Sequence, residues 1–199
     1  IDIVSSGDLV QRFEAAWNAD QLVSHLAASA ALYRIKDRAF HTTAAALHDG
    51  TALTEYDLQQ QMVAWFEEEG LVSDSAPVVA IGANTGNPHY LPTATSCEPI
   101  VADEVLLLDL WGKQAMPGSV FADITWVAVT GTTVPQGPTQ AFHAVTLARD
   151  AAIEMVESAA RTGRDLRGWE VDRAARTVLE QAGYGNRILH RTGHNLGQS

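Results

Sequence analysis

The first part of the chain carries apolar residues at a helical period. The larger apolar residues of segment 20–47 recur at helical spacing and Gly50 follows them, which predicts one long amphipathic helix. These residues are Leu22, Leu26, Tyr33, Phe40 and Leu47. Thr54 followed by Asp57 is typical of a capping box, with Asp in place of the usual Glu or Gln. The apolar stripe that begins there runs to Gly70, so a second helix is expected.

The pattern then changes to short β-rich runs separated by turn residues. Segments 78–81, 105–110 and 120–129 predict three strands. Pro117-Gly118 lies between the last two segments and predicts the loop of a hairpin that joins them.

Two further helices and another strand are expected after Pro138. The helical period returns up to Gly163, and again from Trp169 to Gly183. Sliding the chain on itself by 113 positions pairs the two helical blocks without a gap, and Gly50 then meets Gly163 while Gly70 meets Gly183. Chance similarity between amphipathic helices is the alternative, but a duplication explains both glycines in one register.

The composition and charge of the chain limit the classes of protein to which it can belong. The chain has 199 residues, 46% of them hydrophobic, which is enough for the core of one domain. A formal charge of −11 with scattered basic residues argues against nucleic acid as a partner, and no segment is long and apolar enough to predict a membrane anchor. The single Cys97 fits a reducing compartment, so a cytoplasmic location is expected. Because the chain opens at Ile1 and stops directly after a polar cluster, we expect an excerpt of a longer protein.

Two aspartates in the predicted hairpin are the first candidates for chemistry. Asp109 ends an apolar strand run and Asp123 lies inside the next one. Two carboxylates that converge from adjacent strands favour a cation between them. The alternative for each residue is structural, with Asp109 as the cap of a turn and Asp123 as a solvent-facing residue of an edge strand.

Histidines in two loops add candidate imidazole ligands. His89 follows Pro88 in a proline-flanked loop, where a plain surface histidine is the alternative. His190 and His194 lie on either side of Gly193 near the end of the chain. Neutral imidazole together with carboxylates suits Mn, Co, Fe or Zn.

Taken together, four motifs resemble the methionine aminopeptidase and Xaa-Pro peptidase family of pita-bread metallopeptidases. They are the Pro88-His89 loop, Leu-Leu-Leu-Asp109-Leu-Trp-Gly, Ala-Asp123-Ile-Thr and Arg-Thr-Gly-His194-Asn-Leu-Gly. The resemblance implies an α+β pita-bread fold built from a duplicated helix-helix-strand unit. It implies a single catalytic domain over 1–199 that is incomplete at its C-terminus, with a first repeat at about 20–130 and a second repeat, truncated, from about 133 onward.

The same resemblance implies a site and an activity. Asp109, Asp123 and His194 would be ligands of two divalent metal ions (Mn, Co or Zn), and His89 would orient the substrate. The function expected is a dinuclear metal-dependent aminopeptidase, most similar to the Xaa-Pro peptidases, which hydrolyses a peptide bond near the N-terminus of its substrate through a metal-bridging hydroxide. The partner is a peptide substrate, without nucleic acid or membrane, and a homodimer is an option.

The sequence also departs from the family pattern. Trp126 follows the second aspartate motif where many members carry Arg, which predicts a different contact on the strand face and puts the substrate preference in question. The two glutamate ligands and a further histidine of the family come from downstream of the His194 motif, so this chain alone is expected to be inactive. Two alternatives stay open, a pita-bread module that binds peptide or protein without catalysis, and a metal-free hydrolase of the creatinase kind.

Overall fold

The computed structural model describes residues 6–7, 9–10 and 16–198 of the chain. The chain divides into two compact units. The first extends to Thr133 and includes the chain from Leu196 on, and the second is Val134–Asn195. Each unit is described by itself below.

Two helices of the first unit form where the sequence predicts them. Helix α2 spans Ala19–Asp49, and Gly50 ends it in the left-handed conformation with φ 67°. Helix α3 spans Glu55–Glu68 and begins with the predicted capping box, in which the Thr54 side chain accepts a hydrogen bond from the backbone N–H of Asp57.

The buried face of α2 differs from the predicted stripe. Leu22, Leu26 and Tyr33 are exposed, whereas the side that enters the core carries mostly small residues and two branched ones. The buried hydrophobic residues of α2 are Ala28, Ala31, Leu32, Ile35 and Ala39. Alanine side chains let the helix axis come close to the sheet, so the face with small residues packs against it. Of the predicted stripe, Phe40 packs against the core, partly buried.

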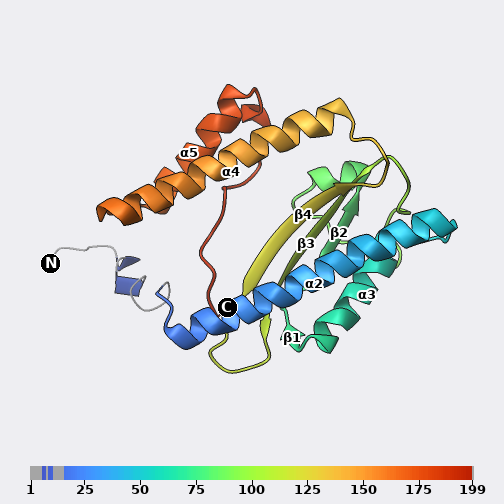
Figure 1. Ribbon diagram of the computed structural model, residues 1–199, viewed down its shortest axis with the longest axis horizontal. Helices are drawn as coiled ribbons and strands as arrows, with labels where there is room; N and C mark the ends of the chain where they lie inside the picture. The colour runs from blue at the N-terminus through green and yellow to red at the C-terminus, as the bar shows by residue number, and fades with distance from the viewer. Residues whose placement is uncertain (1–5, 8, 11–15, 199) are drawn as a thin grey trace. The chain divides into compact units, whose positions relative to one another are not determined.

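An antiparallel sheet completes the first unit, with β3 at its centre. β1 (Leu71–Val72) and β2 (Val78–Ile81) both pair with β3 (Val105–Gln114). β4 (Ala122–Val129) also pairs with β3, through the predicted hairpin. Figure 1 shows α2 and α3 on one face of this sheet, and their buried residues share one core cluster with Leu106, Leu108 and Leu110 of β3.

The second unit is a pair of packed helices. α4 spans Gln136–Thr162 and α5 spans Gly168–Gln181, and they lie side by side (Figure 1). The 113-residue offset maps both ends of α3 onto both ends of α5. Gly163 ends α4 with φ 65°, as Gly50 ends α2.

The strand expected after Gly183 does not form in the described residues. Gly185–Arg187 is a short 3-10 turn, and the chain from Ile188 to Gln198 contains no strand. A strand needs a hydrogen-bonding partner. In the first unit that partner is β3, whereas the described residues of the second unit contain no strand that could pair.

One face of α4 carries exposed apolar residues. Val145, Ile153 and Val156 are 56%, 48% and 47% exposed. The offset maps them onto α2 residues at the sheet, of which Leu32 is fully buried and Thr43 is 4% exposed. We call Val145, Ile153 and Val156 the α4 stripe. It is the counterpart of the α2 face that a sheet covers in the first unit.

Candidate active site

The pairing of β3 with β4 brings the two candidate aspartates onto one face of the sheet. Asp109 lies opposite Thr125, and Asp123 lies opposite Trp111. Directly paired residues of antiparallel strands share a face, and so do residues two positions apart in one strand. Asp109 and Asp123 are therefore diagonal neighbours on one face, and the prediction that they share adjacent strands and a face is confirmed.

This face is the one that α2 and α3 leave uncovered. The buried leucines of β3 alternate with residues of intermediate exposure, among them Asp109 and Trp111. Asp123 is also of intermediate exposure. The two carboxylates consequently lie partly out of water and near each other, where a bound cation would offset both their desolvation and their mutual repulsion.

Hydrogen bonds hold the side chains on this face in place. The Thr125 hydroxyl donates a hydrogen bond of 2.6 Å to Asp109 Oδ1. Trp111 Nε1 donates to Asp74 Oδ1 at 2.7 Å, which holds the indole beside the pair. A carboxylate fixed by a hydroxyl donor in this way keeps its second oxygen in a defined direction.

Trp126 lies on the opposite face from the aspartates. Its ring packs edge-on against Tyr33 of α2, and the Lys36 ammonium lies 4.3 Å from its ring centre. Lys36 is only 8% exposed, so the indole stabilises a cation within the helix–sheet layer. The different strand-face contact expected at Trp126 is thus a contact with α2, because consecutive strand residues face opposite sides, and its effect on substrate preference stays a prediction.

His89 sits in an exposed loop whose backbone is held locally. Its N–H donates to Asn87 Oδ1 at 3.0 Å, and the N–H of Tyr90 donates to the Asn87 carbonyl at 3.0 Å. The loop follows the 3-10 turn Gly82–Gly86 at the end of β2. His89 and the aspartates thus belong to the same compact unit, and a role of His89 beside the substrate stays a prediction.

Sequence reasoning missed a buried carboxylate next to this loop. Glu55, the first residue of α3, is completely buried. Its oxygens accept hydrogen bonds from Ile81 N, Asn84 Nδ2, Tyr90 Oη and Glu98 N. Two causes raise the pKa of the Tyr90 hydroxyl. The larger is its burial, and the second is its hydrogen bond to Glu55. The only sequence signal was an acidic residue at the start of a helix, which is usually exposed.

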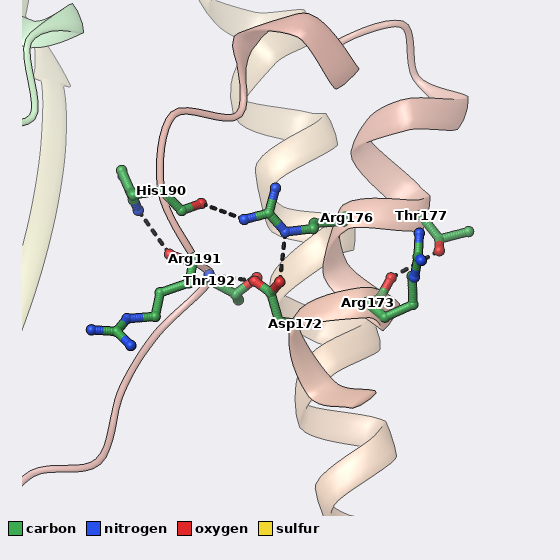
Figure 2. Close-up of polar contacts among 7 residues, drawn as sticks. All are labelled: Asp172, Arg173, Arg176, Thr177, His190, Arg191 and Thr192. Atoms are coloured by element: carbon green, nitrogen blue, oxygen red, sulfur yellow. Dashed lines mark hydrogen bonds and ion pairs between the residues drawn. The ribbon is translucent and has the colours of Figure 1, made fainter. Parts of the chain in front are cut away.

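The second unit holds the segment that carries His190 and His194. Figure 2 shows Asp172 of α5 accepting hydrogen bonds from Thr192 N at 2.7 Å and from Arg176 Nε at 2.6 Å. Arg176 also donates to the His190 carbonyl at 3.0 Å. These contacts attach segment 190–192 to α5, and Asp172 was not singled out from the sequence.

The ring of His194 has a defined tautomer. Its Nδ1 donates to the Asn195 carbonyl at 2.9 Å, which places the lone pair of the neutral ring on Nε2. His194 is exposed and lies in the second unit, and its approach to the aspartates stays a prediction. His190 Nδ1 donates to the Arg191 carbonyl at 2.7 Å.

The chemistry of the donor set fits divalent cations, although the structure assembles only part of it. Asp109 and Asp123 form a carboxylate pair on one face, and carboxylate with imidazole is a donor set of Mn, Co and Zn. Within the described residues, no three His, Cys, Asp or Glu side chains are grouped to hold a metal ion. No helix in that part of the chain is long and apolar enough to cross a membrane.

Comparisons with known proteins identify the family that the chain resembles. The model of metallopeptidase family M24 matches residues 28–199. A Xaa-Pro dipeptidase of Lactobacillus helveticus is 30% identical over 152 residues, which are 75% of this chain and 38% of the relative. A putative dipeptidase of Bacillus subtilis, YkvY, is 29% identical over 168 residues, which are 83% of this chain and 42% of the relative. The chain therefore spans less than half the length of these relatives.

Solved structures show the same fold. Dipeptidase PepE from Mycobacterium ulcerans matches 98% of this chain and 47% of its own chain, with a TM-score of 0.75 and 22% identity. An X-prolyl aminopeptidase from Caenorhabditis elegans, described as a cytosolic enzyme with a di-nuclear active site, matches 88% of this chain and 28% of its own, with a TM-score of 0.64 and 22% identity. The predicted α+β pita-bread fold is confirmed, and the chain covers less than half of each of these two matched structures.

Proposed function

The chain belongs to metallopeptidase family M24, and on that premise we propose that it carries half of the active site of a dinuclear aminopeptidase of the Xaa-Pro type. Such an enzyme hydrolyses a peptide bond near the N-terminus of its substrate. The observation that carries the proposal is the diagonal placement of Asp109 and Asp123 on the open face of the sheet. Similarity to a Xaa-Pro dipeptidase of Lactobacillus helveticus supports the substrate class.

The residues present would divide the work as follows. Asp109 and Asp123 would hold two divalent ions, with Mn, Co or Zn as candidates, and His194 would ligate one of them through Nε2. Bound metal ions would supply Lewis acidity and a water molecule of lowered pKa. His89 would hold the substrate peptide beside the carboxylate pair, and the Thr125 hydroxyl would keep Asp109 aimed at that place.

We propose further that residues 1–199 form one domain with two repeats, at about 20–130 and from about 133 onward. The coincidence of α3 and α5 under the 113-residue offset supports this division. The exposed α4 stripe supports a following segment of about 60 residues, the extent of the strand region from β1 to β4. That segment would supply the remaining ligands and the general base, and without it the chain would be inert and bind metal weakly.

A cytoplasmic location belongs to the same proposal. It is supported by the single Cys97 and by the description of the Caenorhabditis elegans neighbour as cytosolic.

The experiment compares the 199-residue chain with a version extended by about 60 residues of the natural protein, the length of the first strand region. Both are assayed on Xaa-Pro and Met-terminal peptides with added Mn, Co or Zn. We expect turnover of Xaa-Pro peptides by the extended protein alone, and its loss on chelation. Equal turnover by the short chain would overturn the proposed division of the site. Binding of peptide by the extended protein without turnover under any metal would favour the non-catalytic module, and metal-independent turnover would favour the creatinase kind.

A further inference from the structure

A completely buried carboxylate lies beside the His89 loop, and the proposed hydrolysis does not use it. We propose that Glu55 is a positioning residue that acts through Tyr90 to hold His89 in the position from which it contacts the substrate. This inference rests on the proposed function, because it assigns a task to the residue that presents His89 to the substrate. Glu55 itself touches neither the aspartate pair nor, in this proposal, the substrate.

The hydrogen bonds of Glu55 connect both ends and the middle of one segment. Oε1 accepts from the N–H of Ile81, at the end of β2, at 2.7 Å. Oε2 accepts from the N–H of Glu98 at 2.8 Å and from the hydroxyl of Tyr90. The residues from 81 to 98 are thereby tied to a single side chain, and His89 lies near the centre of this segment.

All partners of this carboxylate among the described residues are hydrogen-bond donors. Asn84 contributes its side-chain amide to Oε1 at 3.0 Å, beside the two backbone N–H groups and the Tyr90 hydroxyl. The start of α3 adds the positive end of a helix dipole. An ionised carboxylate satisfies four donors at once, whereas the amide of a glutamine would turn its own N–H groups toward two of them. The position therefore specifies a carboxylate and not merely a polar residue.

Tyr90 transmits this constraint to its neighbour in sequence. Its hydroxyl is held by Glu55 and its N–H by the Asn87 carbonyl, so both ends of the residue are fixed. The N–H of His89 is fixed by the side chain of Asn87. The imidazole of His89, in contrast, is exposed and makes no hydrogen bond within the described part of the chain. A rigid backbone under an accessible ring is what a substrate-contacting residue requires, since an error of about 1 Å can reduce a rate about 100-fold.

The test uses the extended, metal-loaded protein and the substitution Tyr90→Phe, which removes one hydroxyl and keeps the ring. The matched control is Tyr56→Phe on α3, whose hydroxyl makes no hydrogen bond within the described residues. We expect Tyr90→Phe to lower kcat on a Xaa-Pro peptide about tenfold with less than a twofold change in KM. The control should change neither constant more than about twofold.

The readout that separates positioning from general structure is a double-mutant cycle with His89→Ala. If Tyr90 acts through His89, Tyr90→Phe should lower kcat less than about twofold in the His89→Ala background. An undiminished tenfold loss in that background, or no loss in the wild-type background, overturns the positioning role. If His89→Ala alone leaves turnover unchanged, the role of His89 in the proposed function fails, and the positioning role is overturned with it.

Two variants at Glu55 and one hydrogen-exchange measurement, which does not depend on turnover, test the same role. Glu55→Gln should lower kcat more than Tyr90→Phe does, and Glu55→Asp should recover part of the loss because it restores the acceptor charge. Hydrogen exchange of the folded Tyr90→Phe protein should be faster in segment 82–98 and unchanged in β3 and β4. Unchanged exchange in segment 82–98 would contradict the anchoring of the loop even if kcat falls.

Discussion

Replacing Asp109 by asparagine should affect the metal-free and the metal-loaded protein in opposite directions. The asparagine side chain has nearly the same shape as that of aspartate and would still accept the hydrogen bond from Thr125, so the sheet should be preserved. The substitution removes one of two like charges that are diagonal neighbours on the open face of the sheet. The metal-free protein should therefore lose repulsion, and the metal-loaded protein should lose a ligand.

The size of the first effect follows from the strand geometry. Diagonal neighbours are about 7 Å apart, so two unit charges repel by about 0.6 kcal/mol in water and by about 2.4 kcal/mol at an effective dielectric constant of 20. Both aspartates are of intermediate exposure, which places the repulsion at about 1 kcal/mol. In a protein of this size such a gain raises Tm by about 2 to 4 °C.

The second effect has the opposite sign. A metal present at 100 times its Kd stabilises the protein by about 2.7 kcal/mol, and loss of a first ligand should remove at least about 1.4 kcal/mol of this gain, since each tenfold loss of affinity has that value. Thermal unfolding of the extended protein, with and without Mn, Co or Zn, measures both effects. Asp165→Asn is the matched control, because it removes an exposed charge from the loop between α4 and α5.

Two results would refute this reasoning. If Asp109→Asn destabilised the metal-free protein by more than about 2 kcal/mol, the carboxylate would be a structural element of the hairpin. If the metal raised Tm equally in wild type and variant, Asp109 would not be a ligand.

Three further expectations follow from the same geometry. Thr125→Val removes the hydroxyl that orients one carboxylate, so metal affinity measured by calorimetry should fall about 10- to 100-fold with the fold unchanged. In the 199-residue chain, Leu32→Ala should lower the free energy of unfolding in urea by about 3 kcal/mol, because the side chain is completely buried. Val145→Ala on the α4 stripe should lower it by less than about 0.5 kcal/mol. The hydrogen bond from the Thr192 backbone and then that from Arg176 hold the pKa of Asp172 below its ordinary value of 3.8, so this attachment is complete at neutral pH and is lost as pH falls. The NMR signal of the Thr192 amide should therefore titrate with a midpoint below 3.8.

The elements of the first unit were predictable because each leaves a local signal. The capping box at Thr54, the glycines that end the helices and the alternating hairpin strands all depend on neighbours a few residues away. The shared face of Asp109 and Asp123 followed for the same reason, since a hairpin loop and strand alternation determine which side each residue takes.

The face of α2 was not predictable from the same pattern. Large apolar residues mark one stripe, but the sheet packs against the face with Ala28, Ala31 and Ala39. Which stripe is buried depends on how closely the helix approaches the sheet, and hydrophobicity along one segment does not report that distance.

The anchor at Glu55 was missed because its partners are distant in sequence. Tyr90 and Glu98 lie 35 and 43 residues away from it, and no spacing rule connects them. The prediction of a strand near His194 was wrong for a related reason. A strand forms only when it pairs with another strand, and no described residue of the second unit supplies that partner. Local patterns thus predicted the scaffold, and the long-range hydrogen bonds required the structure.

The most direct test of the account is anomalous X-ray diffraction from crystals of the extended protein grown with Mn or Co, recorded at the absorption edge of the metal. We expect two anomalous peaks about 3.5 to 4 Å apart, the usual separation in two-metal sites, on the face of the sheet that carries Asp109 and Asp123, with Nε2 of His194 next to one of them. Peaks at a different place, or no peak within coordination distance of either carboxylate at saturating metal, would contradict the assignment of this face as the metal site.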